Sequence, residues 1–553
     1  MPEPAVTVSD RYSDEDIASF YAAGFWRSDT LYDNLCQQAE KRPDQVLLFD
    51  STRSLTYAAL RDRGLRLAAG LRRLGVQKGD RVAVQIPNWA DFGLLVVACN
   101  RLGAIMVPIM PIYRAEEVGY VLRHSGATLA ITCEGVKGFD YLAMFEDLKA
   151  DSPELTHLAV VRATEALDRS RAIPLEDLEV EGSTEQLAAE VGAGAGPDDG
   201  FLIIYTSGTT ARPKGCFHTV NTLRATAFAI GASLEYSDAD VQFGPSPISH
   251  ATGLLTNFLL PLVYGASCHL MEAWEPVGGM QRIQQHRCTV AVSATAFLQM
   301  MIAAYDPEAN DLSSMRFWVA AGSPVPGSVV ERARTMLSGG RVLSLYGRTE
   351  NFLTTMCTAE DPPERSVTSD GRALHGADVR IVDPEGNEVP RGQEGDIAYK
   401  GPSHMLEYYR DPEQTAALFT SSGHSRSGDL GRMDEDRYVR VTGRLKDIVI
   451  RGGMNISARE IEDLLSEHPS VGNVAVVGYP DERLGERVCA YVVASPGCET
   501  PTLDQLREFL REHKVATQKV PERLEVVDAL PMTATGKVQK HILRDDVAKK
   551  VLA

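Results

Sequence analysis

The sequence predicts an α/β fold, with a large N-terminal domain of parallel-sheet α/β subdomains and a small α+β C-terminal domain. Three observations support this prediction. Strand-like and helix-like segments alternate between residues 55 and 133, an antiparallel pattern begins near residue 378, and the pattern changes again after about residue 445. A chain of 553 residues is too long for one compact core, so several domains or subdomains are expected.

The N-terminal segments justify the parallel sheet. Leucines recur on one helical face from Leu60 to Leu74, and segments 89–102 and 115–126 are also predicted helices. Between and after them lie short apolar runs that are predicted strands, at residues 81–87, 104–109 and 128–133. Alternation of this kind indicates a largely parallel architecture.

The later segments predict three different structures. Residues 188–200 are rich in glycine and should form a flexible connector. Residues 378–401 alternate apolar and polar positions around turns, which predicts a small antiparallel β region. Ser457 and Glu460 form a predicted capping box at the start of a helix. Two strands and a second helix complete the predicted small domain, at residues 471–481, 486–495 and 503–513.

Composition narrows the classes of protein. The formal charge of −19 argues against a nucleic-acid partner, although a small anion needs only local cations. No apolar run approaches the ~18 residues of a membrane span, and the polar start does not resemble a signal peptide. The nine cysteines are scattered without CxxC spacing, which is typical of a reducing compartment. These features predict a soluble, cytoplasmic protein. We expect a monomer or a homodimer.

One loop has the composition of a phosphate-binding site. The segment "YTSGTTARPKGC" (Tyr205 to Cys216) follows the apolar run "FLII". Its small and hydroxyl residues would let backbone N–H groups and hydroxyls surround a phosphate, and Lys214 would add positive charge. The Walker spacing is absent, because no glycine precedes Lys214. Taken alone, the segment could equally be an ordinary polar loop.

Further motifs follow this loop in order. They are "YGRTEN" (Tyr346 to Asn351), "SGDLGRMDEDRYVRVTGRLKDIVIRGGMNIS" and "LPMTATGKVQK". With these motifs, the chain resembles the adenylate-forming superfamily of acyl-CoA ligases, peptide-synthetase adenylation domains and beetle luciferases. The resemblance extends from about residue 30 to 545, and it is greatest to short- and medium-chain or alicyclic acyl-CoA ligases.

The resemblance implies a role for each matching residue. The ATP phosphates would be bound by Thr206, Ser207, Gly208, Thr209, Thr210 and Lys214. Adenine would lie against Gly322, Ser323, Pro324, Tyr346 and Gly347, and the ribose hydroxyls against Asp429, with Arg444 nearby. Thr349 would contact the α-phosphate, Glu350 and Thr206 would hold Mg²⁺, and His250 would lie at the acyl site. Lys537 would bridge carboxylate and phosphate, Lys446 would be the hinge, and Gly452 and Gly453 would line a thiol channel.

The implied chemistry explains these residue types. A carboxylate must attack an α-phosphate, and both are anions, so cations must neutralise the charge that accumulates in the transition state. A thiol then displaces AMP, and Lys537 must leave the site first. The resemblance therefore implies a large domain of residues 1–444 and a small mobile domain of residues 445–553.

Arg348 departs from the family pattern, which usually has a small or uncharged residue there. A guanidinium cannot lose its charge, and burying it without a partner is costly. It would either lean toward a surface carboxylate, or meet an extra anion of the substrate or a small anionic substrate. In isolation, Glu350 could equally cap a helix and Asp429 occupy a turn.

The predicted function is an enzyme that uses ATP, Mg²⁺ and CoA to convert a carboxylic acid into its acyl-CoA. One alternative is a secondary-metabolism relative that activates nitrite to diazotise an aryl amine. A third possibility is an adenylation enzyme that loads a carrier protein. An amino-acid substrate is disfavoured because Ala251, rather than aspartate, follows His250. A nucleotide-binding protein without catalysis is disfavoured because Lys537 and Glu350 are both present.

Overall fold

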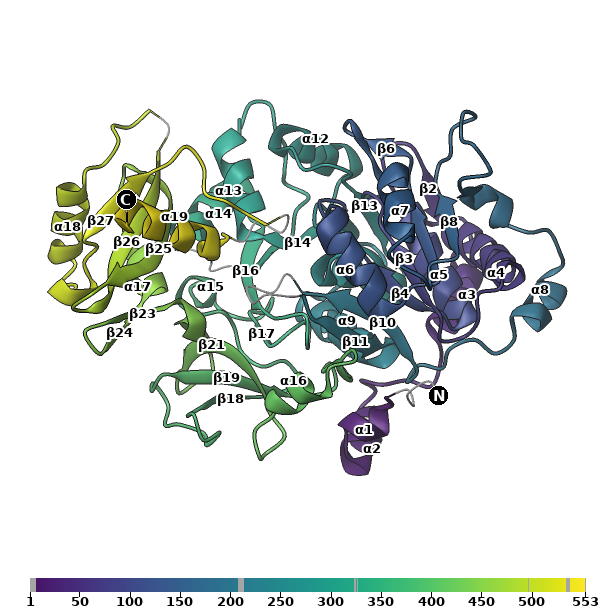
Figure 1. Ribbon diagram of the computed structural model, residues 1–553, viewed down its shortest axis with the longest axis horizontal. Helices are drawn as coiled ribbons and strands as arrows, with labels where there is room; N and C mark the ends of the chain where they lie inside the picture. The colour runs from purple at the N-terminus through teal and green to yellow at the C-terminus, as the bar shows by residue number, and fades with distance from the viewer. Residues whose placement is uncertain are drawn as a thin grey trace.

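Residues 6–206, 213–322, 325, 327–495, 497–533 and 538–552 are described in the computed structural model. A large α/β body forms one side of the molecule, and a smaller α+β domain lies at one end of it (Figure 1). The fold class predicted from the sequence is therefore confirmed. Among the described residues, none of the helices combines the length and apolarity needed to cross a membrane.

Two eight-stranded sheets form the large body. The first has the order β17-β16-β15-β14-β12-β13-β1-β2 and is parallel except at its β16–β17 and β1–β2 edges. Its strands are β1 (Val46–Phe49), β2 (Ser54–Thr56), β12 (Val241–Gly244), β13 (Ser267–Leu270), β14 (Val290–Ala294), β15 (Phe317–Ala321), β16 (Arg341–Tyr346) and β17 (Thr355–Met356).

The second sheet has the order β20-β11-β10-β4-β3-β5-β8-β9. It is parallel from β10 to β9 and antiparallel where β11 joins β10 and β20. Its strands are β3 (Arg81–Val84), β4 (Ile105–Pro108), β5 (Leu129–Thr132), β8 (His157–Val160), β9 (Ile173–Pro174), β10 (Gly200–Tyr205), β11 (Gly215–Thr219) and β20 (Glu407–Tyr408). The three strands predicted between residues 81 and 133 are the centre of this sheet.

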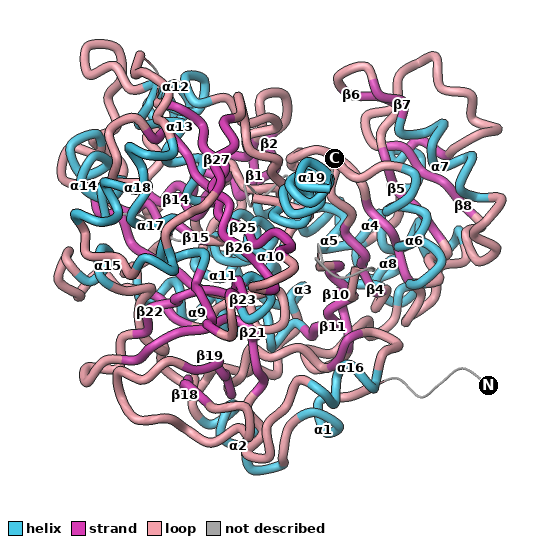
Figure 2. Tube along the Cα trace, turned by 60° about the vertical axis from the view of Figure 1, so that its left-hand side comes forward, coloured by secondary structure: helices cyan, strands magenta, loops and turns pink. Residues whose placement is uncertain are grey.

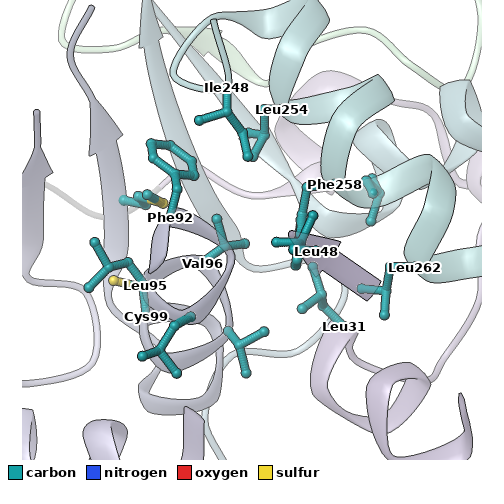
Figure 3. Close-up of a cluster of buried hydrophobic side chains, with 14 of the residues drawn as sticks. Leu31, Leu48, Phe92, Leu95, Val96, Cys99, Ile248, Leu254, Phe258 and Leu262 are labelled. Atoms are coloured by element: carbon teal, nitrogen blue, oxygen red, sulfur yellow. The ribbon is translucent and has the colours of Figure 1, made fainter. Parts of the chain in front are cut away.

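Helix α5 (Asp91–Leu102) connects the cores of the two sheets. Every residue of this helix except Arg101 is buried, as expected for a helix that is covered on all sides. Figure 3 shows side chains of α5 beside Leu48 of β1 and Phe258. A Cβ on Gly93 would lie 2.3 Å from Leu48 and 3.1 Å from Phe258, so this contact requires glycine. Close packing here fixes the position of one sheet against the other.

The large body contains further helices, most of which pack on the sheets. They are α1 (Val8–Arg11), α2 (Asp14–Ala22), α3 (Leu31–Lys41), α4 (Tyr57–Leu74), α6 (Ala115–Ser125), α7 (Tyr141–Lys149), α8 (Thr184–Val191), α9 (Val220–Ser233), α10 (Ala251–Leu254), α11 (Leu260–Tyr264), α12 (Pro276–His286), α13 (Thr295–Ala304), α14 (Gly327–Met336) and α15 (Arg365–Thr368). Helix α8 extends into the predicted connector 188–200, because Ser183 caps its start and Leu187 and Val191 are buried. The connector therefore begins only after Val191.

A four-stranded sheet follows, as predicted, and all its strand pairs are antiparallel. Its order is β18-β19-β21-β22, and helix α16 precedes β21. These elements are β18 (Asp378–Val382), β19 (Gly395–Lys400), α16 (Pro412–Ala417), β21 (Ser425–Met433) and β22 (Val439–Arg444).

The described part of the small domain has five strands and three α-helices. The strands are β23 (Ile448–Arg451), β24 (Met454–Ser457), β25 (Val471–Asp481), β26 (Gly485–Ala494) and β27 (Arg523–Val526), and the helices are α17 (Ala458–Leu465), α18 (Leu503–Glu512) and α19 (Lys540–Leu552). Ser457 caps α17 by accepting a hydrogen bond from the Glu460 amide at 3.4 Å. The Glu460 carboxylate instead pairs with Lys519 at 2.6 Å, so only half of the predicted capping box forms.

Candidate active site

A cavity of about 220 Å³ lies between the large body and the small domain. Six residues predicted for the nucleotide site or hinge line it, namely Gly322, Tyr346, Gly347, Asp429, Arg444 and Lys446. The small domain contributes Arg459 and Glu462 from α17 and Lys540 and Arg544 from α19. Segments more than a hundred residues apart in the sequence therefore form one cavity.

Asp429 is held between two donors in this cavity. The Tyr346 hydroxyl donates to its Oδ2 at 2.7 Å, and Arg444 Nε lies 2.9 Å from its Oδ1. Asp429 and Arg444 are also directly paired across β21 and β22. Burial and the Asp429 charge raise the pKa of Tyr346 well above its ordinary value, so its hydroxyl remains a donor. The carboxylate is fixed, and its oxygens retain lone pairs for further hydroxyl groups.

The motif loop after β16 is held in one conformation by its neighbours. A Cβ on Gly347 would lie 1.9 Å from the Phe352 carbonyl oxygen, so only glycine fits. His218 Nε2 lies 2.8 Å from the Thr349 carbonyl oxygen. Burial lowers the pKa of His218 to about 3, so the ring is neutral and donates from Nε2. His218 therefore positions Thr349.

Glu350 lies close to Lys214, at the end of the loop between β10 and β11. The Tyr408 hydroxyl donates to Glu350 Oε1 at 2.6 Å, and Lys214 Nζ lies 4.7 Å from the centre of the same tyrosine ring. The Thr206 amide donates to the Lys214 carbonyl oxygen at 2.8 Å. Lys214 also donates to Gln414 of α16 at 2.8 Å. Figure 2 shows α16 close to β10 and β11.

A second cavity, of about 70 Å³, adjoins the first. It contains His250, Arg348 and Thr349 in a wall that is otherwise rich in apolar side chains, including Ile230, Leu255, Val292, Phe297 and Phe352. His250 caps α10, and its Nδ1 accepts a hydrogen bond from the Thr252 amide at 3.3 Å. The cap fixes the direction of the imidazole ring at the cavity.

The prediction that Arg348 contacts a surface carboxylate is wrong. Its guanidinium donates to Asn351 Oδ1 and to carbonyl oxygens of Ser425 and Arg426, and within the described residues no carboxylate lies within 4.0 Å of it. The side chain turns toward β21 instead of leaving the protein. The alternative prediction, an extra anion of the substrate, is not tested by these contacts.

Some predicted residues lie outside the described structure. They are Ser207, Gly208, Thr209, Thr210, Ser323, Pro324 and Lys537. Val538, which follows Lys537, lines the larger cavity. Gly452 and Gly453 form an exposed turn between β23 and β24 with φ of 58° and 81°, a conformation that favours glycine. This turn contributes to the lining of neither cavity.

The residues predicted to hold Mg²⁺ provide few ligands. Within the described residues there is no cluster of three or more His, Cys, Asp or Glu side chains that could hold a metal ion. Glu350 offers one carboxylate, and Thr206 offers a hydroxyl from the loop that follows Tyr205. This donor set fits Mg²⁺, which usually keeps several waters and binds through one or two carboxylates and substrate phosphates.

Sequence motifs did not predict three residues that complete the site. Tyr408 and Gln414 lie outside all the motifs, and His218 follows the phosphate loop without a signal of its own. The structure makes each of them a hydrogen-bond partner of a predicted residue.

The large α/β body and the smaller α+β domain share a cavity that is lined by charged residues from both. The family model described as "AMP-binding enzyme" matches residues 35–409, and that described as "AMP-binding enzyme C-terminal domain" matches residues 460–537. The chain belongs to the AMP-binding enzyme family and is an adenylate-forming acid ligase.

Relatives of this chain are named for different carboxylic acids. The chain is 33% identical to the medium-chain fatty-acid–CoA ligase of Escherichia coli (strain K12), over 99% of this chain and 96% of that protein. It is 30% identical to the 2,3-dihydroxybenzoate-AMP ligase of Bacillus subtilis (strain 168), over 98% of each.

Solved structures show the same fold. The anthranilate CoA ligase AuaEII in complex with anthranoyl-AMP matches with a TM-score of 0.85 at 25% identity, covering 95% of this chain and 98% of that one. ATP-bound MatB from Rhodopseudomonas palustris matches with a TM-score of 0.83 at 28% identity, covering 94% and 99%.

Proposed function

We propose that the protein is an AMP-forming ligase that activates a short, apolar monocarboxylic acid with ATP and transfers the acyl group to CoA. One observation carries this proposal. The two cavities share Gly322, Leu345 and Gly347, so they meet at the ends of β15 and β16. A nucleotide in the larger cavity and an acid in the smaller one would bring an α-phosphate and a carboxylate together, as the reaction requires.

The nucleotide would occupy the larger cavity. Gly322, Ser323, Pro324, Tyr346 and Gly347 would border the adenine, and Asp429 would accept the ribose hydroxyls. The hydrogen bonds from Tyr346 and Arg444 support this role, because they fix the Asp429 carboxylate before ATP arrives. Arg444 would also offset the charge of Asp429.

The triphosphate would extend toward the loop between β10 and β11. Thr206, Ser207, Gly208, Thr209, Thr210 and Lys214 would donate to its oxygens. Thr349 would donate to the α-phosphate, and Lys537 would lie between that phosphate and the carboxylate. The line of contacts from Thr206 through Lys214 and Tyr408 to Glu350 supports this arrangement. Glu350 and Thr206 would hold Mg²⁺, which neutralises phosphate charge when bound.

The smaller cavity supports a small acid. Its volume of about 70 Å³ is below the ~150 Å³ of a cavity known to hold benzene. Its wall is mostly apolar, which favours a hydrocarbon body. His250 would border the acyl group, in the orientation that its helix cap fixes.

The second step would use the mobility of the small domain. Lys537 must withdraw before a thiol can reach the acyl carbonyl, and Lys446 would be the hinge. Gly452 and Gly453 would then line the thiol channel. In this step the thiolate sulfur forms the new bond to the acyl carbon, and AMP leaves with the electrons of the broken C–O bond.

Two other functions remain as alternatives. Activation of nitrite to diazotise an aryl amine is favoured by the small volume of the acid cavity, since nitrite is smaller than any carboxylic acid with a hydrocarbon chain. Loading of a carrier protein is suggested by an aryl relative named as salicyl-AMP ligase / salicyl-S-ArCP synthetase.

The proposal is tested by measuring AMP formation with ATP and Mg²⁺ and identifying the product by mass spectrometry. The acid panel contains short, medium, alicyclic and aryl acids with CoA, and nitrite with an aryl amine without CoA. We expect AMP together with the acyl-CoA of a short acid. AMP only with nitrite would support that alternative, and no AMP with any member would contradict both the CoA ligase and the nitrite-activating enzyme. Pyrophosphate and acyl-adenylate without AMP would support the carrier-loading alternative.

A further inference from the structure

We propose that Arg348 is a positioning residue that clamps the motif loop 346–351 to the start of β21. This inference rests on the proposed function. Through the clamp, Thr349 and Glu350 on one segment and Asp429 on the other keep a fixed relative position. The two segments supply the predicted contacts to the α-phosphate, the metal and the ribose, so their separation determines how ATP is seated.

The hydrogen bonds of Arg348 define the clamp. Nε donates to Asn351 Oδ1 at 3.1 Å, within the motif loop. Nη2 donates to the Ser425 carbonyl oxygen at 3.0 Å and to Ser425 Oγ, and Nη1 donates to the Arg426 carbonyl oxygen. One side chain therefore bonds to its own loop and to two consecutive residues of β21.

Both ends of the clamp are themselves anchored. Ser425 is fully buried, and its Oγ donates to the Tyr399 carbonyl oxygen of β19 at 3.1 Å. Asn351 is also buried and donates from Nδ2 to the Leu353 carbonyl oxygen at 3.1 Å. Movement of Arg348 would disturb both anchors, which lie within a few residues of Glu350 and Asp429.

A substrate anion at Arg348 would have to compete with these same bonds. A guanidinium has five N–H donors, and four of them are used by Asn351, Ser425 and Arg426. A carboxylate that binds in the usual bidentate manner needs two parallel donors. It would have to break at least one bond of the clamp, so the clamp favours an acid without a second charge.

The geometry also explains why lysine would be an inferior residue here. The planar guanidinium directs its donors along fixed, diverging lines, whereas an ammonium group is a single point on a flexible stem. A lysine side chain at this position could reach one carbonyl oxygen of β21, but it could not bond to Asn351 and β21 together in the same way.

The experiment compares R348K and R348M with a matched control, R101M. Arg101 also donates from both Nη atoms to backbone carbonyl oxygens, those of Ala188 and Gly192, but it joins α5 to α8. Binding of a fluorescent ATP analogue with Mg²⁺ is measured first, without acid. Steady-state AMP formation then gives kcat and KM for ATP and for the best acid, and thermal unfolding checks the fold.

We expect R348M to weaken nucleotide binding and to lower kcat/KM for ATP by about 100-fold, because small misplacements have effects of this size. R348K should recover part of the loss, about tenfold, and the KM for acid should stay within about threefold of the wild-type value. R101M should lose thermal stability with little change in nucleotide binding.

Three results would overturn the clamp. They are an R348M variant with wild-type nucleotide binding, a selective rise in the KM for acid, and equal losses of nucleotide binding in R348M and R101M. The binding measurement does not depend on the acid. If the wild-type protein binds nucleotide but forms no AMP, the proposed function fails while the clamp is still tested.

Discussion

At the scale of single residues, Tyr408 connects Glu350, the proposed Mg²⁺ ligand, to Lys214 of the proposed phosphate loop. Its hydroxyl donates to Glu350 Oε1 at 2.6 Å, and its ring lies beneath Lys214. Tyr408→Phe would keep the ring but remove this donor. The Glu350 carboxylate would then lose the hydrogen bond that fixes its orientation. We expect the Mg²⁺ concentration for half-maximal AMP formation to rise about tenfold, which is typical when a partner of a metal ligand is lost. A Mg²⁺ titration of the variant measures this change.

Tyr438→Phe provides the matched control. The Tyr438 hydroxyl also donates to a buried carboxylate, Asp361 Oδ1, at 2.6 Å. Each variant loses one hydrogen bond to a carboxylate, and we expect each to lose about 1–3 kcal/mol of unfolding free energy. Only Tyr408→Phe should change the Mg²⁺ requirement. An equal shift in both variants would show that the effect reports stability and not the metal site.

At the scale of elements, His218 of β11 binds the motif loop and makes the stability of the protein depend on pH. Burial lowers the pKa of His218 from 6.5 to about 3. The histidine is therefore protonated near pH 6.5 in the unfolded chain but stays neutral in the folded protein. The free energy of unfolding consequently falls as the pH falls from 6.5 toward 3. Between pH 7 and pH 5 this residue alone should remove about 2 kcal/mol of unfolding free energy.

The measurement is denaturant unfolding of the wild-type protein and His218→Gln at pH 7, 6 and 5. The glutamine side chain keeps an N–H donor for the Thr349 carbonyl oxygen but has no titration in this range. The stability of this variant should fall less steeply than that of the wild type, by about 2 kcal/mol over the interval. The exposed His513→Gln is the control and should follow the wild-type curve. Parallel curves for wild type and His218→Gln would disprove the prediction.

The elements also show how far the sequence predicts this molecule. Parallel strands and the cavity-lining motif residues were predictable, because periodicity and motif spacing are local signals. The partners were not, since His218 meets Thr349 across 131 residues and Tyr408 meets Glu350 across 58 residues. Arg348 shows the same limit. Its charge is visible in the sequence, but its direction depends on how β21 packs against the motif loop.

At the scale of the whole molecule, one orientation of the small domain is held by contacts across the domain boundary. Ser457 Oγ donates to the Thr442 carbonyl oxygen at 2.6 Å. Arg459 Nη2 lies 3.7 Å from Asp370 Oδ2, and the Val441 amide holds that same carboxylate oxygen at 2.9 Å. Arg459 is 7% exposed, so its interaction with Asp370 is weakly screened. In this orientation Val538 lines the cavity that contains Tyr346.

These contacts predict that Arg459→Gln separates the two steps of the proposed reaction. The orientation with Val538 at the cavity is the one that would bring Lys537 to the nucleotide. Weakening it should slow formation of the acyl-adenylate about tenfold relative to acyl transfer, since couplings of 1–3 kcal/mol shift equilibria by such factors. Single-turnover measurements of each half-reaction, the second started from isolated acyl-adenylate, give the ratio.

The control for domain damage is Arg507→Gln, which removes an exposed pair with Asp504 and hydrogen bonds to the Pro521 and Glu522 carbonyl oxygens, all within the small domain. Its ratio of half-reactions should equal that of the wild type. Asp370→Asn should change the ratio in the same direction as Arg459→Gln, because it removes the other member of the pair. If Arg459→Gln slows both half-reactions equally, the pair contributes to stability and does not select the orientation. If Asp370→Asn leaves the ratio unchanged, Arg459 acts through a different partner.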